Sequence, residues 1–200
     1  MSNSMSHQTN TGPRMMAAEV QQLVREAKAG NGSAFRHLVE RYMKPTYNLA
    51  FSFVGDHHSA EDLTQEVFIR VYQSLPSFRG DAEFSTWLYR ITVNLALNRS
   101  KQIIRRAERE QPLLLSADLP AGNDHDRALT VDWAHHIERA LHELPTLQRA
   151  VVILRHLNGL STKQVSSILC CSEGAVKTHL HRGLKKLRST LQFLAEDLAS

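Results

Sequence analysis

Apolar residues recur in this sequence with the spacing of an α-helix, and that period limits the possible folds more than any other feature. The first such set lies at i, i+3, i+4 and i+7, on one face of a helix. It consists of Val20, Leu23, Val24 and Ala27. Later segments repeat the spacing, and none shows the sustained alternation of a half-buried strand. We therefore predict an all-α protein.

Glycine and proline residues divide this pattern into separate helices. Gly30-Asn31-Gly32 ends the first helix, and Ser33 is expected to cap the second. Pro45 lies inside the second helix and should kink or restart it, because proline has no backbone N–H to donate. Ser59 is expected to open the third helix, which Pro76 stops.

One long irregular segment interrupts the helical pattern and divides the chain into two small domains. Residues 103–132 contain prolines, an Asn-Asp pair and five acidic residues from position 110 onward, against one arginine. This composition is typical of a flexible linker, here an acidic one. The predicted domains are residues 20–102 and 133–195. Residues 1–19 begin with a polar stretch and are predicted to form a disordered tail.

Composition narrows the class of protein. Hydrophobic residues make up 42% of the chain, enough for a core, yet no apolar run reaches the roughly 18 residues that a membrane span needs. Cys170 and Cys171 are adjacent and cannot form a disulfide framework, so a reducing cytoplasm is the expected compartment. The net charge of +4 permits an anionic partner without requiring one.

Eleven histidines make metal chemistry the first enzymatic possibility to test. His57-His58 and His135-His136 are neighbours in sequence, and adjacent helical residues point in different directions. Neither pair has the i, i+4 spacing of a helical zinc hydrolase. Phosphate-binding glycine loops and nucleophile-elbow motifs are also absent from the sequence. We therefore expect neither enzyme activity, nor a metal site, nor a cofactor.

The segment from Leu160 to Arg188 has the pattern of a helix-turn-helix. Ser161 and Gln164 can form a capping box at the start of a short helix. Ser172 can cap a second helix after a turn of about three residues. That second helix is basic, with five Lys or Arg and one acidic residue between Glu173 and Arg188. Such a unit is typical of DNA-binding proteins.

A second nucleic-acid pattern runs from Pro76 to Arg109. Aromatic residues crowd its start, amides follow, and Arg99 to Arg106 holds four cations and no acid. Single-stranded nucleic acid rests its bases on aromatic rings and its phosphates on Lys or Arg. The pattern fits that ligand, although Phe84 and Trp87 would also suit a hydrophobic core.

Several motifs occur in an order that covers residues 20–194. They are Ala60-Glu61-Asp62-Leu63-Thr64-Gln65-Glu66-Val67-Phe68, Phe78-Arg79-Gly80-Asp81, Thr86-Trp87-Leu88-Tyr89-Arg90-Ile91, Leu144-Pro145, Arg149, Gly159-Leu160-Ser161 and Gly174-Ala175-Val176-Lys177. In this order and spacing the chain resembles the extracytoplasmic-function (ECF) group of bacterial sigma-70 family factors. Cys170 stands in the turn where that family often has Gly or another residue that tolerates left-handed backbone.

The resemblance implies a role for each domain. Residues 20–102 would be sigma region 2, which docks on the clamp helices of core RNA polymerase and recognises and melts the −10 element. Residues 133–195 would be sigma region 4, which holds the polymerase flap and reads the −35 element. The polymerase-binding residues would be Asp62, Gln65, Glu66 and Phe68. The −10 residues would be Phe78, Arg79, Phe84, Trp87, Tyr89, Arg90, Asn94, Asn98 and Arg99. The −35 residues would be Lys177, Thr178, His179, His181, Arg182, Lys185 and Lys186.

The resemblance also implies partners and a place of action. The protein would direct promoter-specific transcription initiation in the bacterial cytoplasm, associated with the nucleoid when it is in the holoenzyme. It would be a monomer outside that complex and would be restrained by an anti-sigma factor.

Two other functions stay open on the sequence. A helix-turn-helix regulator that works without polymerase would dimerise on a palindrome, and the motif from Asp62 to Phe68 argues against it. A helical metal-dependent hydrolase would use the histidines, and their spacing argues against it.

Overall fold

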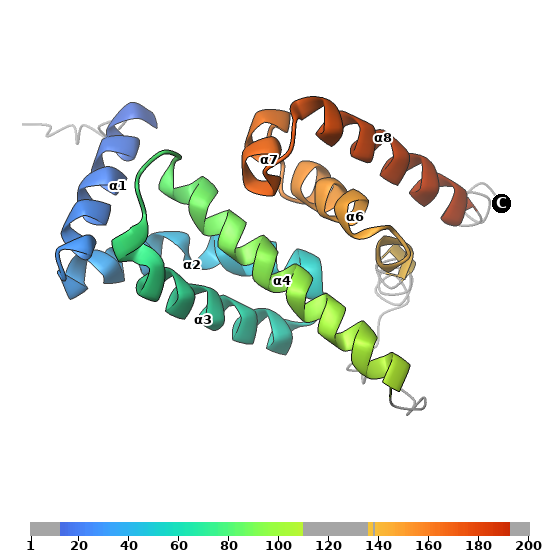
Figure 1. Ribbon diagram of the computed structural model, residues 1–200, viewed down its shortest axis with the longest axis horizontal. Helices are drawn as coiled ribbons and strands as arrows, with labels where there is room; N and C mark the ends of the chain where they lie inside the picture. The colour runs from blue at the N-terminus through green and yellow to red at the C-terminus, as the bar shows by residue number, and fades with distance from the viewer. Residues whose placement is uncertain (1–12, 110–135, 138, 193–200) are drawn as a thin grey trace, which may run out of the picture.

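A computed structural model describes residues 13–109, 136–137 and 139–192, and within these ranges the chain forms helices and no strands (Figure 1). The predicted all-α class is confirmed. The first group of helices is α1 (Pro13–Lys28), α2 (Gly32–Val54), α3 (His57–Ser74), the 3-10 turn η1 (Leu75–Ser77) and α4 (Phe84–Arg109). The second group is α6 (Thr146–Val152), the π-helical turn η2 (Ile153–Leu157), α7 (Thr162–Leu169) and α8 (Glu173–Thr190).

Two predicted boundaries differ from the helices observed. Helix α1 begins at Pro13, so residues 13–19 are helical although we predicted a disordered tail there. Helix α4 runs to Arg109, into the segment predicted as linker. Helix α1 begins ahead of its first periodic apolar residue, at a segment rich in Met and Ala, and α4 continues beyond its last one through a segment rich in Arg and Lys; all four residue types have good helix propensity. The rest of the predicted tail and linker lies outside the described residues.

Helix α2 is continuous through Pro45, so of the kink or restart predicted there, the restart is wrong. Pro45 itself is exposed, whereas Leu49, Ala50 and Phe53 beyond it are buried. The packing of this second half stabilises the helix enough to compensate for one missing backbone hydrogen bond.

The caps of α2 and α3 also differ from the prediction. Asn31, not Ser33, caps α2, and its side-chain oxygen accepts from the backbone N–H of Ser33 at 3.0 Å. Asp56, not Ser59, caps α3 in the same way, accepting from the N–H of Ser59 at 2.7 Å. Each serine lies in the first turn because an Asx side chain two or three positions earlier supplies the cap.

The core of the first group lies where α2, α3 and α4 meet. Leu38, Leu63, Val67 and Leu88 are almost fully buried there. Each such side chain contributes about 1.5–3 kcal/mol on burial, so this layer holds the three long helices together. In the second group, Ile153 and other apolar residues of η2, α7 and α8 are buried in the same continuous cluster.

Two arginines join the groups across their boundary, where α7 contacts α4 and η2 contacts α2. Figure 1 shows α7 beside α4. Arg149 of α6 is buried and donates from Nη2 to the carbonyl of Phe53 in the last turn of α2. Arg90 of α4 donates from Nη2 to the carbonyl of Ser167 in the last turn of α7, at 2.7 Å. Carbonyls in the last turn of a helix lack intrahelical partners and attract cations, so each arginine completes a helix end of the other group.

Candidate nucleic-acid interface

Helices α7 and α8 form the predicted helix-turn-helix. Ser161 and Gln164 make the capping box: the N–H of Ser161 donates to Oε1 of Gln164 at 2.8 Å, and the N–H of Gln164 donates to Oγ of Ser161 at 3.2 Å. Cys170 ends α7 in a left-handed conformation with φ 53°. Ser172 then caps α8 by accepting from the N–H of Ala175 at 3.1 Å. The sequence predicted both caps.

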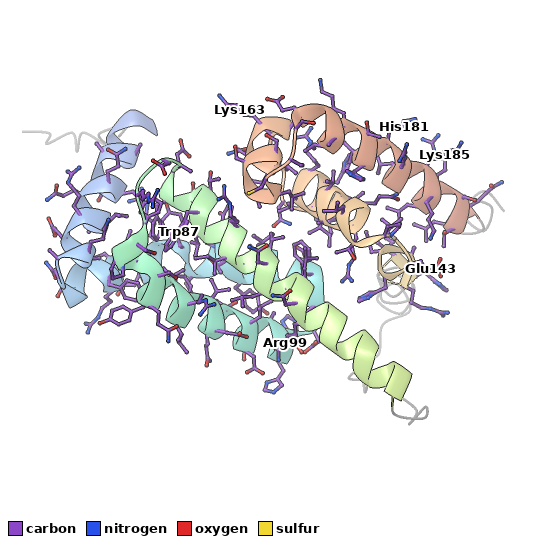
Figure 2. All side chains as sticks on the ribbon, viewed as in Figure 1. Trp87, Arg99, Glu143, Lys163, His181 and Lys185 are labelled. Atoms are coloured by element: carbon purple, nitrogen blue, oxygen red, sulfur yellow. The ribbon has the colours of Figure 1, made fainter. Side chains whose placement is uncertain are left out.

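One side of α8 is fixed against α6. Val176 is buried, and a Cβ placed on Gly183 would lie 2.9 Å from Cγ2 of Val152. That spacing is closer than a methyl group tolerates, so the two helices approach at a glycine. The opposite side of α8 therefore faces solvent, and Figure 2 shows His181 and Lys185 on it.

The predicted −35 residues fall into three sets on α8. The exposed set, which we call the reading face, consists of Lys177, Thr178, His181, Arg182 and Lys185. His179 is half-buried, and its Nδ1 is shielded from solvent. Lys186 is exposed but donates from Nζ to the carbonyl of Glu143 at 2.6 Å, so in this structure it braces its own domain.

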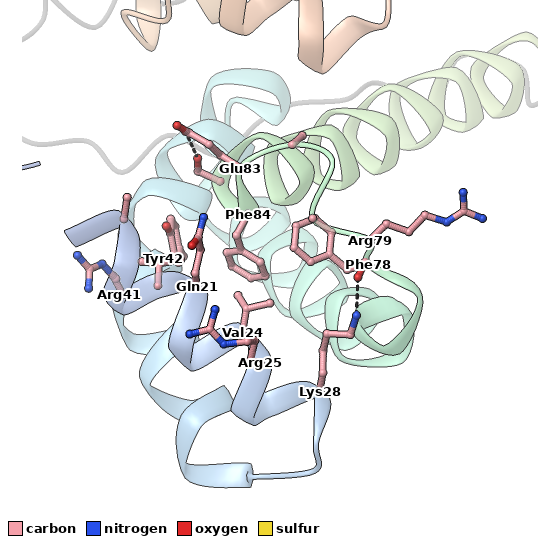
Figure 3. Close-up of a pocket in the computed structure, with 15 residues that line it drawn as sticks. Gln21, Val24, Arg25, Lys28, Arg41, Tyr42, Phe78, Arg79, Glu83 and Phe84 are labelled. Atoms are coloured by element: carbon pink, nitrogen blue, oxygen red, sulfur yellow. Dashed lines mark hydrogen bonds between the residues drawn. The ribbon is translucent and has the colours of Figure 1, made fainter. Parts of the chain in front are cut away.

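Three aromatic residues of the second predicted pattern, Phe78, Phe84 and Trp87, cluster at a cavity. The cavity measures about 520 Å³ and opens between α1, α2 and the loop 78–83 that joins η1 to α4 (Figure 3). The ring of Phe78 stands 4.8 Å from that of Trp87 and 6.0 Å from that of Phe84. Tyr42 closes the other side, 5.3 Å from Phe84. Burial raises the pKa of Tyr42, so its hydroxyl stays protonated near neutral pH.

Of the predicted −10 residues, only Phe78, Arg79 and Phe84 line this cavity. Phe84 is buried and contributes to the core as well, as the sequence left open. Trp87 is half-buried behind Phe78. The sequence did not predict that helix α1 forms a wall of the cavity, since nothing in the periodicity of α1 reveals which helix it meets.

The remaining predicted −10 residues spread along α4. Tyr89 is half-buried at the boundary with the second group of helices, beside Arg90 with its bond to Ser167. Asn94 and Asn98 are exposed. They share one stripe of the helix with Arg90, so α7 lies over one end of that stripe and leaves the other end open.

Arg99 pairs with a residue predicted for a different partner. Its Nη2 lies 3.3 Å from Oδ2 of Asp62 on α3, and its Nη1 donates to the carbonyl of Ser59 at 3.4 Å. Asp62 was predicted for polymerase docking and Arg99 for DNA. The ion pair joins α3 to α4 and places the two predicted surfaces next to each other.

The exposed face of α3 holds most of the predicted polymerase-binding residues. Asp62, Gln65 and Glu66 are exposed on it, whereas Phe68 is 7% exposed and belongs to the core. The sequence analysis did not predict two large residues on the same side of α3 as part of this surface. Ile69 is 59% exposed and Tyr72 is 63% exposed. The spacing was the available signal: Ile69 lies at i+4 from Gln65 and i+3 from Glu66, and Tyr72 lies at i+7 from Gln65. We call Gln65, Glu66, Ile69 and Tyr72 the α3 face.

The described residues contain neither a cluster of metal ligands nor a membrane-spanning helix. No three His, Cys, Asp or Glu side chains gather there as metal ligands would. Among the same residues, every helix is too short or too polar to cross a membrane.

A helix-turn-helix with an exposed basic face, carried beside a second helical unit, is the architecture of a DNA-binding protein. Comparison with known families gives the class more closely: residues 38–109 match Sigma-70 region 2, and residues 135–187 match Sigma-70, region 4. The chain therefore belongs to the sigma-70 family, in the ECF group of RNA polymerase sigma factors, and acts in transcription initiation.

Full-length relatives support this placement. The chain is 30% identical to the ECF RNA polymerase sigma factor SigW of Bacillus subtilis, over 90% of its own length and 100% of that protein's. It is 33% identical to the RNA polymerase sigma-H factor of Pseudomonas aeruginosa, over 88% of its own length and 96% of that protein's. The solved structure of CnrH in complex with the cytosolic domain of CnrY aligns with a TM-score of 0.63 and 25% identity, covering 87% of this chain and 97% of CnrH.

Proposed function

We propose that this sigma factor reads the −35 element with the reading face of α8 and captures a base of the −10 element in the cavity beside loop 78–83. The observation that carries the proposal is the pairing, in one chain, of an exposed basic recognition helix with an aromatic-lined cavity. The first suits duplex DNA and the second suits an unstacked base. A binding factor of this kind needs no catalytic residue or cofactor, and we propose none.

The −35 contact would be direct readout in the major groove. Lys177, Thr178, His181 and Arg182 lie within the first three turns of α8, toward the N-terminal part of a recognition helix that meets base edges. A well-placed arginine contributes about 1–3 kcal/mol of discrimination against a wrong base. Lys185 lies beyond them and is suited to a phosphate, which it would bind regardless of sequence.

Melting of the −10 element would depend on the cavity. Extruding one base from a duplex costs a few kcal/mol. Stacking on an aromatic side chain returns about 1–3 kcal/mol per base, and hydrogen bonds in the pocket add to it. A cavity of about 520 Å³ falls in the roughly 300–1,000 Å³ range of small-molecule sites and has room for a single base. Asn94 and Asn98 would then contact the strand as it leaves along α4.

The α3 face would dock on the clamp helices of core polymerase. It combines acidic and amide groups with exposed Ile69 and Tyr72, and a protein interface gains most from such apolar and aromatic anchors. Phe68 would support this face from the core without touching polymerase. Helix α6 and the turn after it would hold the flap.

Control of the protein would come from a separate partner. CnrH, the structural relative, is described in complex with the cytosolic domain of CnrY. We propose that an anti-sigma factor restrains this chain as well, that the free protein is a monomer, and that it acts in the cytoplasm at the nucleoid.

Run-off transcription tests the proposed function. Purified protein is added to core RNA polymerase on a DNA library with randomised upstream sequence, and transcript starts are sequenced. Start sites preceded by two conserved elements at fixed spacing are expected only when both components are present. Sequence-specific binding of a dimer to palindromic DNA without polymerase would instead support the alternative, a helix-turn-helix regulator.

A further inference from the structure

We propose that Lys28, the last residue of α1, positions the loop that encloses the base cavity and so sets how sharply region 2 discriminates among −10 bases. The inference rests on the proposed function of that cavity. Its basis is a contact across 50 residues of sequence: Nζ of Lys28 donates a hydrogen bond to the carbonyl of Phe78 at 2.6 Å (Figure 3).

Phe78 is the residue at which loop 78–83 begins, and three of its groups are held. Its N–H donates to the carbonyl of Leu75 at 3.1 Å and closes the 3-10 turn. Its ring packs on Trp87. Lys28 holds its carbonyl. Because the carbonyl fixes the peptide plane that leads into the loop, losing Lys28 frees the direction in which the loop leaves Phe78.

Further along the loop, Gly80 has a φ of +82°, in the left-handed region. A Cβ built at Gly80 would meet no atom within 4 Å, so the space on that side of the loop is open. The loop therefore has one anchored end at Phe78 and the start of α4 at the other. The anchor at Phe78 is supplied from outside the loop, by Lys28 of helix α1.

Helix α1 turns a complete stripe toward the cavity. Gln21, Val24, Arg25 and Lys28 all line it, and they lie at i, i+3, i+4 and i+7. The match to the Sigma-70 region 2 model begins at residue 38, so this stripe lies outside the residues that this model matches.

Two other cations on the helices around the cavity have partners outside the loop. Arg41 of α2 pairs with Glu19 at 2.9 Å, and Arg25 donates to the side chain of Gln22 at 2.5 Å. Lys28 alone among these three is bonded to the loop. It is exposed, so its bond competes with water and its contribution is modest. We expect a loosened loop to reduce base discrimination about threefold to tenfold.

The first arm of the test measures the loop without DNA. Hydrogen–deuterium exchange on the full-length protein compares wild type, Lys28→Met, Lys28→Arg and Arg36→Met. Lys28→Met keeps an apolar stem and removes the donor, Lys28→Arg keeps a donor, and exposed Arg36 on α2 is not among the residues that line the cavity. Faster exchange in loop 78–83 is expected for Lys28→Met alone. Unchanged exchange in that variant would overturn the tether.

The second arm measures discrimination in the holoenzyme, on the randomised library used for the proposed function. Lys28→Met should lower base preference in the −10 element about threefold to tenfold and leave −35 preference intact. Lys28→Arg should restore it. Equal −10 preference in Lys28→Met and wild type would overturn the inference. If wild type itself gives no start sites, the proposed function fails, and the exchange arm alone decides whether Lys28 positions the loop.

Discussion

Two neighbouring basic residues of α8, Lys185 and Lys186, illustrate how structure separates side chains that a sequence groups together. Both were predicted to contact −35 DNA. Lys186 is bonded to the carbonyl of Glu143, whereas Lys185 makes no hydrogen bond or ion pair within the described residues. Lys185 is therefore available to bind a phosphate. Lys186 would have to break its hydrogen bond to the carbonyl of Glu143 before it could do the same.

We predict different outcomes for Arg182→Ala and Lys185→Ala. Arg182→Ala should flatten the preference among single-base −35 variants, at a cost of about 1–3 kcal/mol on the preferred sequence. Lys185→Ala should weaken binding to all −35 DNA variants alike. It should also lower the slope of log binding constant against log salt concentration by about one unit. Holoenzyme binding to a −35 panel at two salt concentrations distinguishes them. Uniform losses for both variants would remove Arg182 as a base reader.

A second prediction at this scale concerns polymerase docking. Glu66→Arg reverses a charge on the α3 face without touching an intramolecular pair, whereas Asp62→Arg also breaks the contact with Arg99. Glu66→Arg should weaken binding to core polymerase with no change in thermal stability. Tyr72→Ala should weaken it by about 1 kcal/mol or more if the exposed ring is an interface anchor. Titration of labelled protein with core polymerase at matched salt measures both, and unchanged affinity in both would exclude the α3 face.

At the scale of elements, Gly174 and Gly183 of α8 allow a matched test of how closely α8 packs on α6. Gly183→Ala would place a methyl group 2.9 Å from Val152, so overpacking of about 1–3 kcal/mol should outweigh the roughly 1 kcal/mol gained in helix propensity. Gly174→Ala meets only Oγ of Ser172, at 3.8 Å, and should be neutral or stabilising. Thermal unfolding of both variants checks this. A stabilised Gly183→Ala would show that α6 and α8 can move apart freely.

Elements whose signals are local were predictable from the sequence. Ser161, Gln164 and Ser172 each act within three residues of themselves, and the helix-turn-helix they define is confirmed. The restart predicted at Pro45 was wrong because the packing of residues beyond it compensates for the missing backbone hydrogen bond. Ser33 and Ser59 were misjudged because Asn or Asp nearby offered an equally good cap, and spacing alone does not choose between them.

The sites that combine distant segments were only partly predictable. The aromatic residues of loop 78–83 indicated a nucleic-acid site, but the wall supplied by α1 depends on how two helices pack. The exposure of Ile69 and the burial of Phe68 likewise depend on which face of α3 meets α2 and α4. Periodicity indicates that a helix has an apolar face, and tertiary packing decides where that face ends.

At the scale of the whole molecule, the two helical groups are joined through polar contacts as well as apolar ones. Arg149 reaches the carbonyl of Phe53, and Nδ2 of Asn158 donates to Oγ of Ser52 at 3.3 Å. The same closed arrangement engages Arg90, a predicted −10 residue, with Ser167 of α7. In this arrangement one end of the predicted DNA stripe on α4 is covered, while the reading face of α8 and the α3 face stay exposed.

The last prediction follows from that geometry: weakening the contact between the groups should increase single-strand binding. Arg149→Met removes a buried, charge-assisted hydrogen bond to the carbonyl of Phe53, a loss of about 1.5–3 kcal/mol. It also removes the contacts of Arg149 with His142, and it leaves an apolar side chain in place of the guanidinium. Ser52→Ala removes the acceptor that Asn158 has in the other group of helices and leaves its bond to the carbonyl of Ile153, so it should act in the same direction with a smaller effect.

Small-angle scattering and binding of a mixed-sequence single-stranded 12-mer measure the two consequences in the free protein. The radius of gyration should rise as the groups separate, and affinity for the oligonucleotide should rise several-fold because Tyr89 and Arg90 become accessible. Circular dichroism checks that helix content is kept, and Arg36→Met, an exposed change away from the boundary, is the control. The prediction is contradicted if Arg149→Met and Ser52→Ala both retain the wild-type radius of gyration and oligonucleotide affinity. In that case the contact at Arg90 does not limit access to α4. Asn94 and Asn98, at the open end of the stripe, would then determine how the free protein binds a single strand.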